Sequence, residues 1–354
     1  MNTASVKAKL KNYAINTGIT FQEALTYYGL ERTIYRISIS KYADRFILKG
    51  GIFLYAIFDG RYERATTDID LLARRINNSS DEMKAIFHDI LLQEADDALI
   101  FDLGSIAVEN IAELKEYHGL NVSVTAYLDR TRIPVSIDIG FGDVIHPNAI
   151  KMDFPIMLDM DVPRINAYSL ESAVAEKLEA IIHNGYLNSR YKDFYDLYIL
   201  SDKYSFSYKE LRSAVVETFE NRNTSMTLDT AAFTDEFIND PVHQSRWKAF
   251  LKKKKALIDV SLEDTIFRIK TFSAPLFTDA EFTKWAPNTG LWESVTSGNK
   301  IDKMIDEIED YYDLKWAEDR AKDDNGTRFS MREMAEKFNI TEEELEAIPD
   351  VEID

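Results

Sequence analysis

Two aspartates interrupt an apolar run, and this pattern restricts the folds open to the chain. In "TTDIDLL", residues 66–72, Asp68 and Asp70 alternate with Ile69 and Leu71. Side chains alternate between the two faces of a strand, so a strand here directs both carboxylates to one face and the apolar residues to the core. Two neighbouring carboxylates repel each other, and Mg²⁺ relieves that repulsion while it also binds substrate phosphates. The alternative is that both acids face solvent on a half-exposed strand.

A third carboxylate lies in a similar alternating pattern. Asp138 belongs to "VSIDIGFG", and the segments 120–128 and 133–142 read as an antiparallel pair of strands joined by "DRTR". Three acids on neighbouring strands can hold two metal ions for an in-line displacement at phosphorus. Asp68, Asp70 and Asp138 are therefore the predicted ligands of Mg²⁺ or Mn²⁺.

A glycine pair precedes the aspartates. Residues 46–49 predict a strand that leads into Lys49, Gly50 and Gly51, and residues 51–58 predict a helix directly behind it. Glycine amides at a helix N-terminus let a phosphate approach closely, and the helix dipole favours its negative charge. A strand, a glycine pair, a helix and a D-x-D strand, in this order, resemble the core of the nucleotidyltransferase superfamily.

The first half of the chain mixes strand and helix patterns, whereas the second half is mostly helical. Residues 79–95 predict a helix capped by Ser79 or Ser80, and residues 146–165, with three prolines, predict irregular chain or an edge strand. Residues 260–277 read as the closing helix of the second half. We expect an α+β fold with three parts: N-terminal helices and a minimal nucleotidyltransferase (polymerase-beta-like) core in residues 1–164, a mostly helical domain in 165–294, and an acidic helical extension in 295–354.

Charge is distributed unevenly along the chain. The net charge is -19, and residues 301–354 alone hold 19 acidic and 7 basic residues, a net charge of -12. Residues 1–300 nevertheless include a basic run, Lys252–Lys255, so a local phosphate-binding surface is compatible with the negative net charge. In the acidic extension the apolar residues Ile301, Met304, Ile305 and Ile308 recur at helical spacing, so it can dock as an amphipathic helix over the site or serve as a solvated tail.

Other functional classes are disfavoured by composition. The chain has no cysteine, which excludes disulfides and thiolate chemistry and fits a cytoplasmic setting. The N-terminus lacks the apolar middle of a signal peptide, and no apolar run approaches the ~20 residues of a membrane span, so no membrane insertion is expected. The histidines show no zinc-ligand spacing, and no phosphate-binding loop of the G-x-x-x-x-G-K-[ST] type is present.

Four motifs in order resemble the AbiEii/AbiGii family of nucleotidyltransferase toxins, which occur in toxin–antitoxin and phage-abortive-infection loci. They are the glycine pair with "RATTDIDLL", then "SIDIGFGD", "EKLEAII" and "RYKDFYDLYIL", and the resemblance spans about residues 5–290. It implies a metal-dependent nucleotidyltransferase that uses an NTP. By this resemblance, the catalytic residues are Asp68, Asp70, Lys177 and Asp193, and the nucleotide-binding residues are Lys49, Gly50, Gly51, Thr66, Arg190 and Lys192.

The resemblance also implies partners, and it leaves alternatives open. The acceptor is expected to be RNA, with the 3′ end of tRNA as the first candidate, and a cognate antitoxin is expected, with direct contact left open. Transfer to a small molecule or a protein, a catalytically inert nucleotide- or RNA-binding protein, and a D-x-D glycosyltransferase are the alternatives. Taken singly, Lys177 can also extend along a helix surface to solvent, and Asp193 can cap a helix.

Overall fold

The computed structural model describes residues 2–294 except 62–65, 112–118, 255, 257 and 279. The chain divides into two compact units, Met1–Val295 and Thr296–Asp354. The predicted acidic extension and its apolar residues therefore lie outside the described residues. The predicted division at residue 164 stays a prediction. Among the described helices, none has the length and apolarity needed to cross a membrane.

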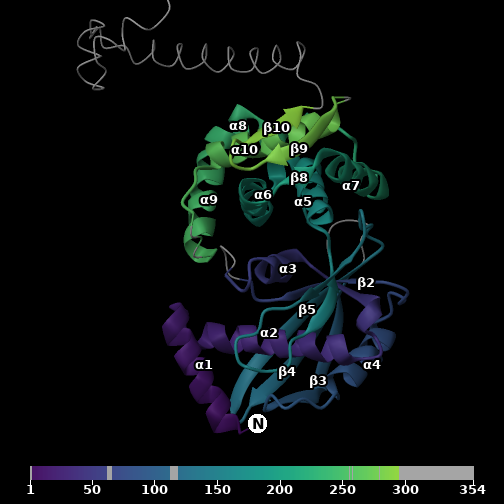
Figure 1. The fold of residues 1–354 in the computed structure, drawn as a ribbon, viewed down its shortest axis with the longest axis vertical. Coiled ribbons are helices and arrows are strands. Elements are labelled where there is room, and N and C mark those ends of the chain that lie inside the picture. Colours follow the sequence, from purple (N-terminus) through teal and green to yellow (C-terminus); the bar gives the residue numbers. More distant parts are fainter. Residues whose placement is uncertain are drawn as a thin grey trace, which may run out of the picture. The chain divides into compact units, whose positions relative to one another are not determined.

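A seven-stranded mixed sheet forms the centre of the first part of the chain (Figure 1). Its strand order is β3-β4-β5-β2-β1-β7-β6, with parallel pairing only between β2 and β5 and between β1 and β7 among the described strands. Strand β6 lies at an edge, as the prolines around it predicted. The strands are β1 (Phe46–Lys49), β2 (Ile69–Ala73), β3 (Leu99–Ile111), β4 (Gly119–Leu128), β5 (Thr131–Phe141), β6 (Ile150–Asp153) and β7 (Arg164–Ala167).

Four helices accompany this sheet: α1 (Thr3–Thr17), α2 (Phe21–Ile39), α3 (Gly50–Ile57) and α4 (Ser80–Leu91). Helix α2 runs across the sheet in Figure 1 and approaches β5 so closely that a Cβ at Gly29 would lie 2.7 Å from Ile133 Cγ2. Ser79 caps α4, because its hydroxyl accepts a hydrogen bond from the Glu82 amide. The predicted strand–helix–strand–helix order of this region is confirmed.

The second half is mainly helical, as predicted, but it also contains a small sheet. Strand β8 pairs with β9, and β9 pairs with β10. The expectation that residues 260–277 close this part was wrong, because β9 and β10 follow and pack Trp285 and Trp292 against Phe272. The elements are α5 (Leu170–Asn184), α6 (Tyr191–Lys203), β8 (Phe206–Ser207), α7 (Tyr208–Asn221), α8 (Asp235–Asn239), α9 (Pro241–Lys254), α10 (Leu262–Ser273), β9 (Phe282–Ala286) and β10 (Leu291–Ser294).

Helix α2 carries charged side chains into the core, where they find partners. The Arg36 guanidinium donates to both Asp97 carboxylate oxygens, at 2.6 and 3.1 Å. Glu31 accepts the Met157 amide at 2.7 Å and lies 3.6 Å from Arg32. Burial raises the pKa of Glu31 to about 7, although Arg32 and the Met157 amide lower it. The Glu31 charge therefore costs stability at neutral pH.

Replacing Glu31 with glutamine should stabilise the protein in a pH-dependent way. The folded state holds a proton on Glu31 up to about pH 7, whereas the unfolded chain releases it near its ordinary value, so wild-type stability falls as pH rises through this window. Glutamine stays neutral and keeps an acceptor for the Met157 amide. We expect Glu31→Gln to gain about 1 to 3 kcal/mol at pH 8 and little at pH 5.

Thermal denaturation at several pH values measures this effect. The exposed Glu109→Gln variant is the matched control, and its melting temperature should follow the wild type at every pH. A Glu31→Gln effect of the same size at pH 5 and pH 8 would contradict the assignment of a buried, proton-binding carboxyl.

Candidate active site

Three carboxylates converge beside the central sheet. The parallel pairing of β2 and β5 places Asp70 opposite Asp138. Asp68 lies in the bend one residue before β2, so the prediction that both aspartates lie within the strand was wrong for Asp68. Ligand oxygens of Asp68, Asp70 and Asp138 nevertheless all lie within 4.8 Å of one another. The sequence-predicted acid set is thus brought together.

Burial and neighbouring carboxylates both act on Asp70. Burial raises the pKa of the Asp70 carboxyl to about 6, and the Asp68 and Asp138 carboxylates add to the rise. Lys192 and Lys49 lower it, but they do not cancel the increase. The protein therefore holds negative charge at Asp70 against an unfavourable environment.

The glycine pair is shaped around Asp70. Gly50 begins α3 with a φ of 64°, in the left-handed region, and the Gly51 amide donates to Asp70 Oδ2 at 3.3 Å. A Cβ at Gly50 would lie 2.0 Å from the same oxygen. Glycine is required at this position both by the backbone and by the carboxylate beside it.

Two residues that sequence reasoning missed orient the acids. Asn121 of β4 donates to Asp138 Oδ1 at 2.6 Å and to Ser136 Oγ at 2.8 Å. The Thr67 amide and hydroxyl both lie 3.2 Å from Asp68 Oδ1. Asn121 stands directly opposite Asp138 in the β4–β5 register, which the predicted antiparallel pair could have revealed. The predicted residue Thr66 is buried next to Thr67.

Helices α5 and α6 supply a second group of charges. Lys177 is 8% exposed, and its Nζ lies 2.6 Å from Asp196 Oδ2 and 3.4 Å from Asp193 Oδ1. The Arg190 Nε donates to Asp193 Oδ2 at 2.7 Å. Burial would raise the pKa of Asp193, but Lys177 and Arg190 hold it below its ordinary value. Lys177 is consequently a buried, paired cation and does not extend to solvent along the helix surface.

Lys192 connects the two groups electrostatically. It is exposed, and it lowers the pKa of both Asp70 and Asp193. The start of α6 therefore lies close enough to the acid cluster for the Lys192 ammonium group to interact electrostatically with Asp70. Figure 1 shows α5 and α6 beyond the sheet, past α3.

Lys49 occupies a different setting from the one predicted for a nucleotide contact. Its Nζ lies 2.6 Å from Asp143 Oδ2 and 2.9 Å from Glu176 Oε1. Burial alone would lower the pKa of Lys49, but Glu176 and Asp143 hold it well above its ordinary value. Arg222, the residue after α7, joins the same group, with Nη2 at 2.8 Å from Asp143 and 3.1 Å from Glu176. Lys49 therefore connects the end of β1 to α5 and, through the shared acids, to Arg222 at the end of α7.

The donor set of the acid cluster fits a divalent metal ion. Carboxylate oxygens are the ligands that Mg²⁺ and Mn²⁺ prefer, and a bound cation would offset both the burial of the Asp70 carboxylate and its repulsion by Asp68 and Asp138. The residues that could hold the ion are Asp68, Asp70 and Asp138.

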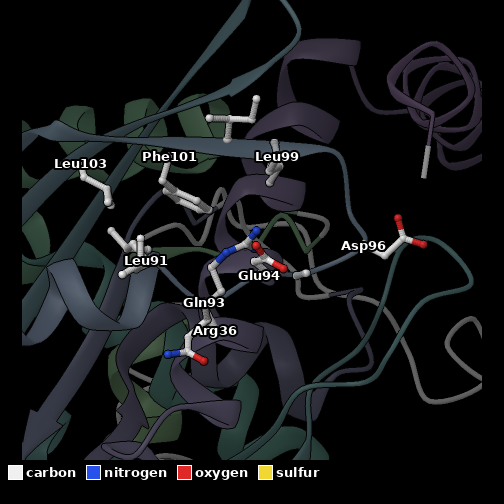
Figure 2. Close-up of a pocket in the computed structure, with 11 residues that line it drawn as sticks. Arg36, Leu91, Gln93, Glu94, Asp96, Leu99, Phe101 and Leu103 are labelled. Carbon is white, nitrogen blue, oxygen red and sulfur yellow. The ribbon is translucent and has the colours of Figure 1, made fainter.

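A cavity of about 520 Å³ lies elsewhere, between the end of α4 and β3 (Figure 2). Its walls include the apolar side chains of Leu91, Leu99, Phe101 and Leu103, and none of the predicted site residues. Arg36, its buried cation, is already bound to Asp97. The chemistry of the acid cluster does not extend to this cavity.

Comparison with known proteins identifies the sequence pattern. The family model described as "Nucleotidyl transferase AbiEii toxin, Type IV TA system" matches residues 32–268. Among solved structures, the chain is similar to JHP933 from Helicobacter pylori, with 14% identity, a TM-score of 0.40, and coverage of 70% of this chain and 89% of that one. The chain is also similar to a putative nucleotidyltransferase from H. pylori, with 16% identity, a TM-score of 0.40, and coverage of 72% of this chain and 94% of that one. None of the curated proteins matches.

The fit between Gly50 and Asp70 can be tested with a pair of glycine variants. Gly50 and Gly18 both have positive φ, but a Cβ at Gly18 would meet no atom within 4 Å. Each change to alanine should cost about 1 to 2 kcal/mol through the backbone. Only Gly50→Ala should also displace Asp70 and weaken Mn²⁺ binding, by about 10- to 100-fold. Calorimetric titration with Mn²⁺ distinguishes the effect on Asp70 from the backbone cost that both variants share. Equal Mn²⁺ affinity in both variants would contradict this role of Gly50.

Proposed function

The chain belongs to the AbiEii family of nucleotidyl transferase toxins of type IV toxin–antitoxin systems, and from this premise we propose that it transfers a nucleotide from an NTP to an acceptor hydroxyl. The 3′ end of tRNA is the proposed acceptor, with arrest of translation, and hence of growth during phage infection, as the consequence. The observation that supports this most is the convergence of Asp68, Asp70 and Asp138 within 4.8 Å.

The proposed reaction is a displacement at the α-phosphorus of the NTP. The acceptor oxygen forms a bond to this phosphorus, the bond to the oxygen that bridges to the β-phosphate breaks, and pyrophosphate leaves. A Mg²⁺ or Mn²⁺ ion held by the three carboxylates would neutralise charge on the triphosphate. The proton of the acceptor hydroxyl passes to a carboxylate or to water.

The chain's own cations and amides have separate roles in this proposal. The Gly51 amide and the start of α3 hold the Asp70 carboxylate and favour phosphate nearby. Lys192, exposed and close to the acid cluster, contacts the triphosphate together with Arg190. Lys177 stabilises the charge that develops on the leaving pyrophosphate. Asp193, ionised because of Lys177 and Arg190, orients both cations and is the candidate proton acceptor.

Transfer can be measured with NTPs labelled at different phosphates. Each NTP is supplied with Mg²⁺ and total RNA, once with label at the α-phosphate and once at the γ-phosphate. Nucleotide transfer places only the α-label on RNA, and we expect this label on tRNA. Asp70→Asn should abolish it while the protein stays folded, because the change removes a repelled charge but keeps an acceptor for the Gly51 amide.

The other outcomes of this experiment are equally informative. The γ-label on an acceptor would indicate phosphoryl transfer and contradict the proposal. Label on protein or on an added small molecule, with none on RNA, would contradict the tRNA acceptor alone. Full transfer by Asp70→Asn would contradict the role of the acid cluster.

Lys177 needs a test that accounts for its buried partner. Lys177→Met alone leaves Asp193 and Asp196 with uncompensated charge, which costs about 3 to 5 kcal/mol. We therefore compare Lys177→Met/Asp196→Asn with Asp196→Asn alone, at matched melting temperature. The double variant should transfer nucleotide on the order of 10²- to 10³-fold more slowly. Equal rates would show that Lys177 is a structural cation only.

A further inference from the structure

Helix α9 presents a basic face in a chain of net charge -19. The helix, Pro241–Lys254, contains no Asp or Glu. Its residues Arg246, Lys248, Lys252 and Lys253 are all exposed. Among the described residues, no carboxylate forms an ion pair with any of the three lysines. A concentrated positive surface of this kind attracts polyanions.

The opposite face of α9 is anchored in the protein. His243 and Trp247 are buried, and the His243 Nδ1 lies 2.7 Å from the Tyr191 hydroxyl of α6. Trp247 packs against Tyr191 and Tyr195, with ring centroids 6.2 and 6.4 Å apart. The apolar side of the helix is therefore used for packing on α6. A helix that binds a lipid surface needs that side free, so nucleic acid is the polyanion that this face fits.

The basic face continues from the candidate active site. Arg190 and Lys192 flank Tyr191, the first residue of α6, and the Lys192 cation acts on Asp70 of the acid cluster. Burial raises the pKa of Tyr191, and the guanidinium of Arg246 opposes that rise, so Arg246 lies next to the same tyrosine. The Arg246 guanidinium of α9 therefore lies near the start of α6, where Lys192 acts on Asp70, and Figure 1 shows α9 beside α6.

Helix α1 provides a contrast within the same chain. It also contains lysines and no acid. Lys7, however, pairs with Asp129 at 3.2 Å, and Lys11 lies 5.6 Å from the centre of the Phe21 ring. Within the described ranges, no ion pair joins Lys248, Lys252 or Lys253 to a carboxylate, in contrast to Lys7 of α1.

We propose that the basic face of α9, made of Arg246, Lys248, Lys252 and Lys253, binds the phosphate backbone of the RNA acceptor while its reacting end enters the acid cluster. This inference rests on the proposed function, and it adds the surface that holds the acceptor. Each lysine that neutralises a phosphate releases a counterion, so binding through this face depends steeply on salt.

The test uses the full chain and purified, fluorescently labelled tRNA. The triple variant Lys248→Gln/Lys252→Gln/Lys253→Gln is compared with a control triple, Lys9→Gln/Lys84→Gln/Lys151→Gln, which removes three exposed lysines from α1, α4 and β6. Fluorescence anisotropy is recorded between about 50 and 200 mM salt. We expect the α9 variant to bind tRNA at least about tenfold more weakly at low salt, with a salt slope smaller by about 2 to 3.

Further measurements separate this inference from the proposed function. Binding of Mg²⁺ and NTP should be unchanged in the α9 variant, and in the transfer assay its KM for tRNA should rise while kcat stays constant. If no transfer is detected at all, the binding comparison still decides the role of α9. Equal tRNA affinities for the α9 and control variants would overturn the inference. The inference would also be overturned if the α9 variant lost binding to anionic phosphatidylserine vesicles but kept its tRNA affinity. That result would indicate that the basic face binds lipid.

Discussion

Mutual repulsion among three carboxylates is the constraint around which the centre of this protein is built. Asp68, Asp70 and Asp138 place oxygens within 4.8 Å of one another, and burial with this repulsion raises the pKa of Asp70 to about 6. Such an arrangement persists only if the surrounding structure fixes it. The parallel pairing of β2 with β5 sets Asp70 opposite Asp138, and a glycine at position 50 leaves room for the Asp70 carboxylate.

A second layer of charge joins the sheet to the helices behind it. Lys49, at the end of β1, and Arg222, directly after α7, share the carboxylates of Asp143 and Glu176. Glu176 precedes Lys177 in the middle of α5, so the contacts that hold Glu176 also hold the turn of the helix that carries Lys177. Breaking a buried group of this kind by removing one partner is costly, because the remaining charge is left uncompensated. The network therefore gives Lys177 of α5 a defined position with respect to β1.

Local patterns in the sequence were sufficient to predict much of the fold and the members of the acid cluster. Alternation identified β2, β4 and β5, and the glycines marked the start of α3. Strand β3 was not predicted, because its alternation is broken where the register shifts between Asp102 and Ala107. Strands β9 and β10 were also missed, since each is short and gains its stability from tryptophans packed against α10.

Side-chain partners drawn from distant elements were harder to predict. Lys49 precedes the glycine pair and was assigned to the nucleotide, but its partners come from the end of β5 and from α5. No local sequence pattern predicts a contact between residues so far apart in the chain. Asn121 was accessible in principle, because the predicted β4–β5 pair places it opposite Asp138. The sequence thus predicts which carboxylates come together, and the tertiary structure shows which residues hold them.

The central claim is that the three carboxylates are kept together for a divalent cation that carries a triphosphate. Crystals grown with Mn²⁺ and a non-hydrolysable NTP analogue test it directly through the anomalous scattering of manganese. We expect a manganese peak at about 2.0 to 2.2 Å from oxygens of Asp68, Asp70 and Asp138, with the triphosphate extending toward Lys192 and the start of α3. A triphosphate bound at another site, with no manganese at the three aspartates, would contradict it.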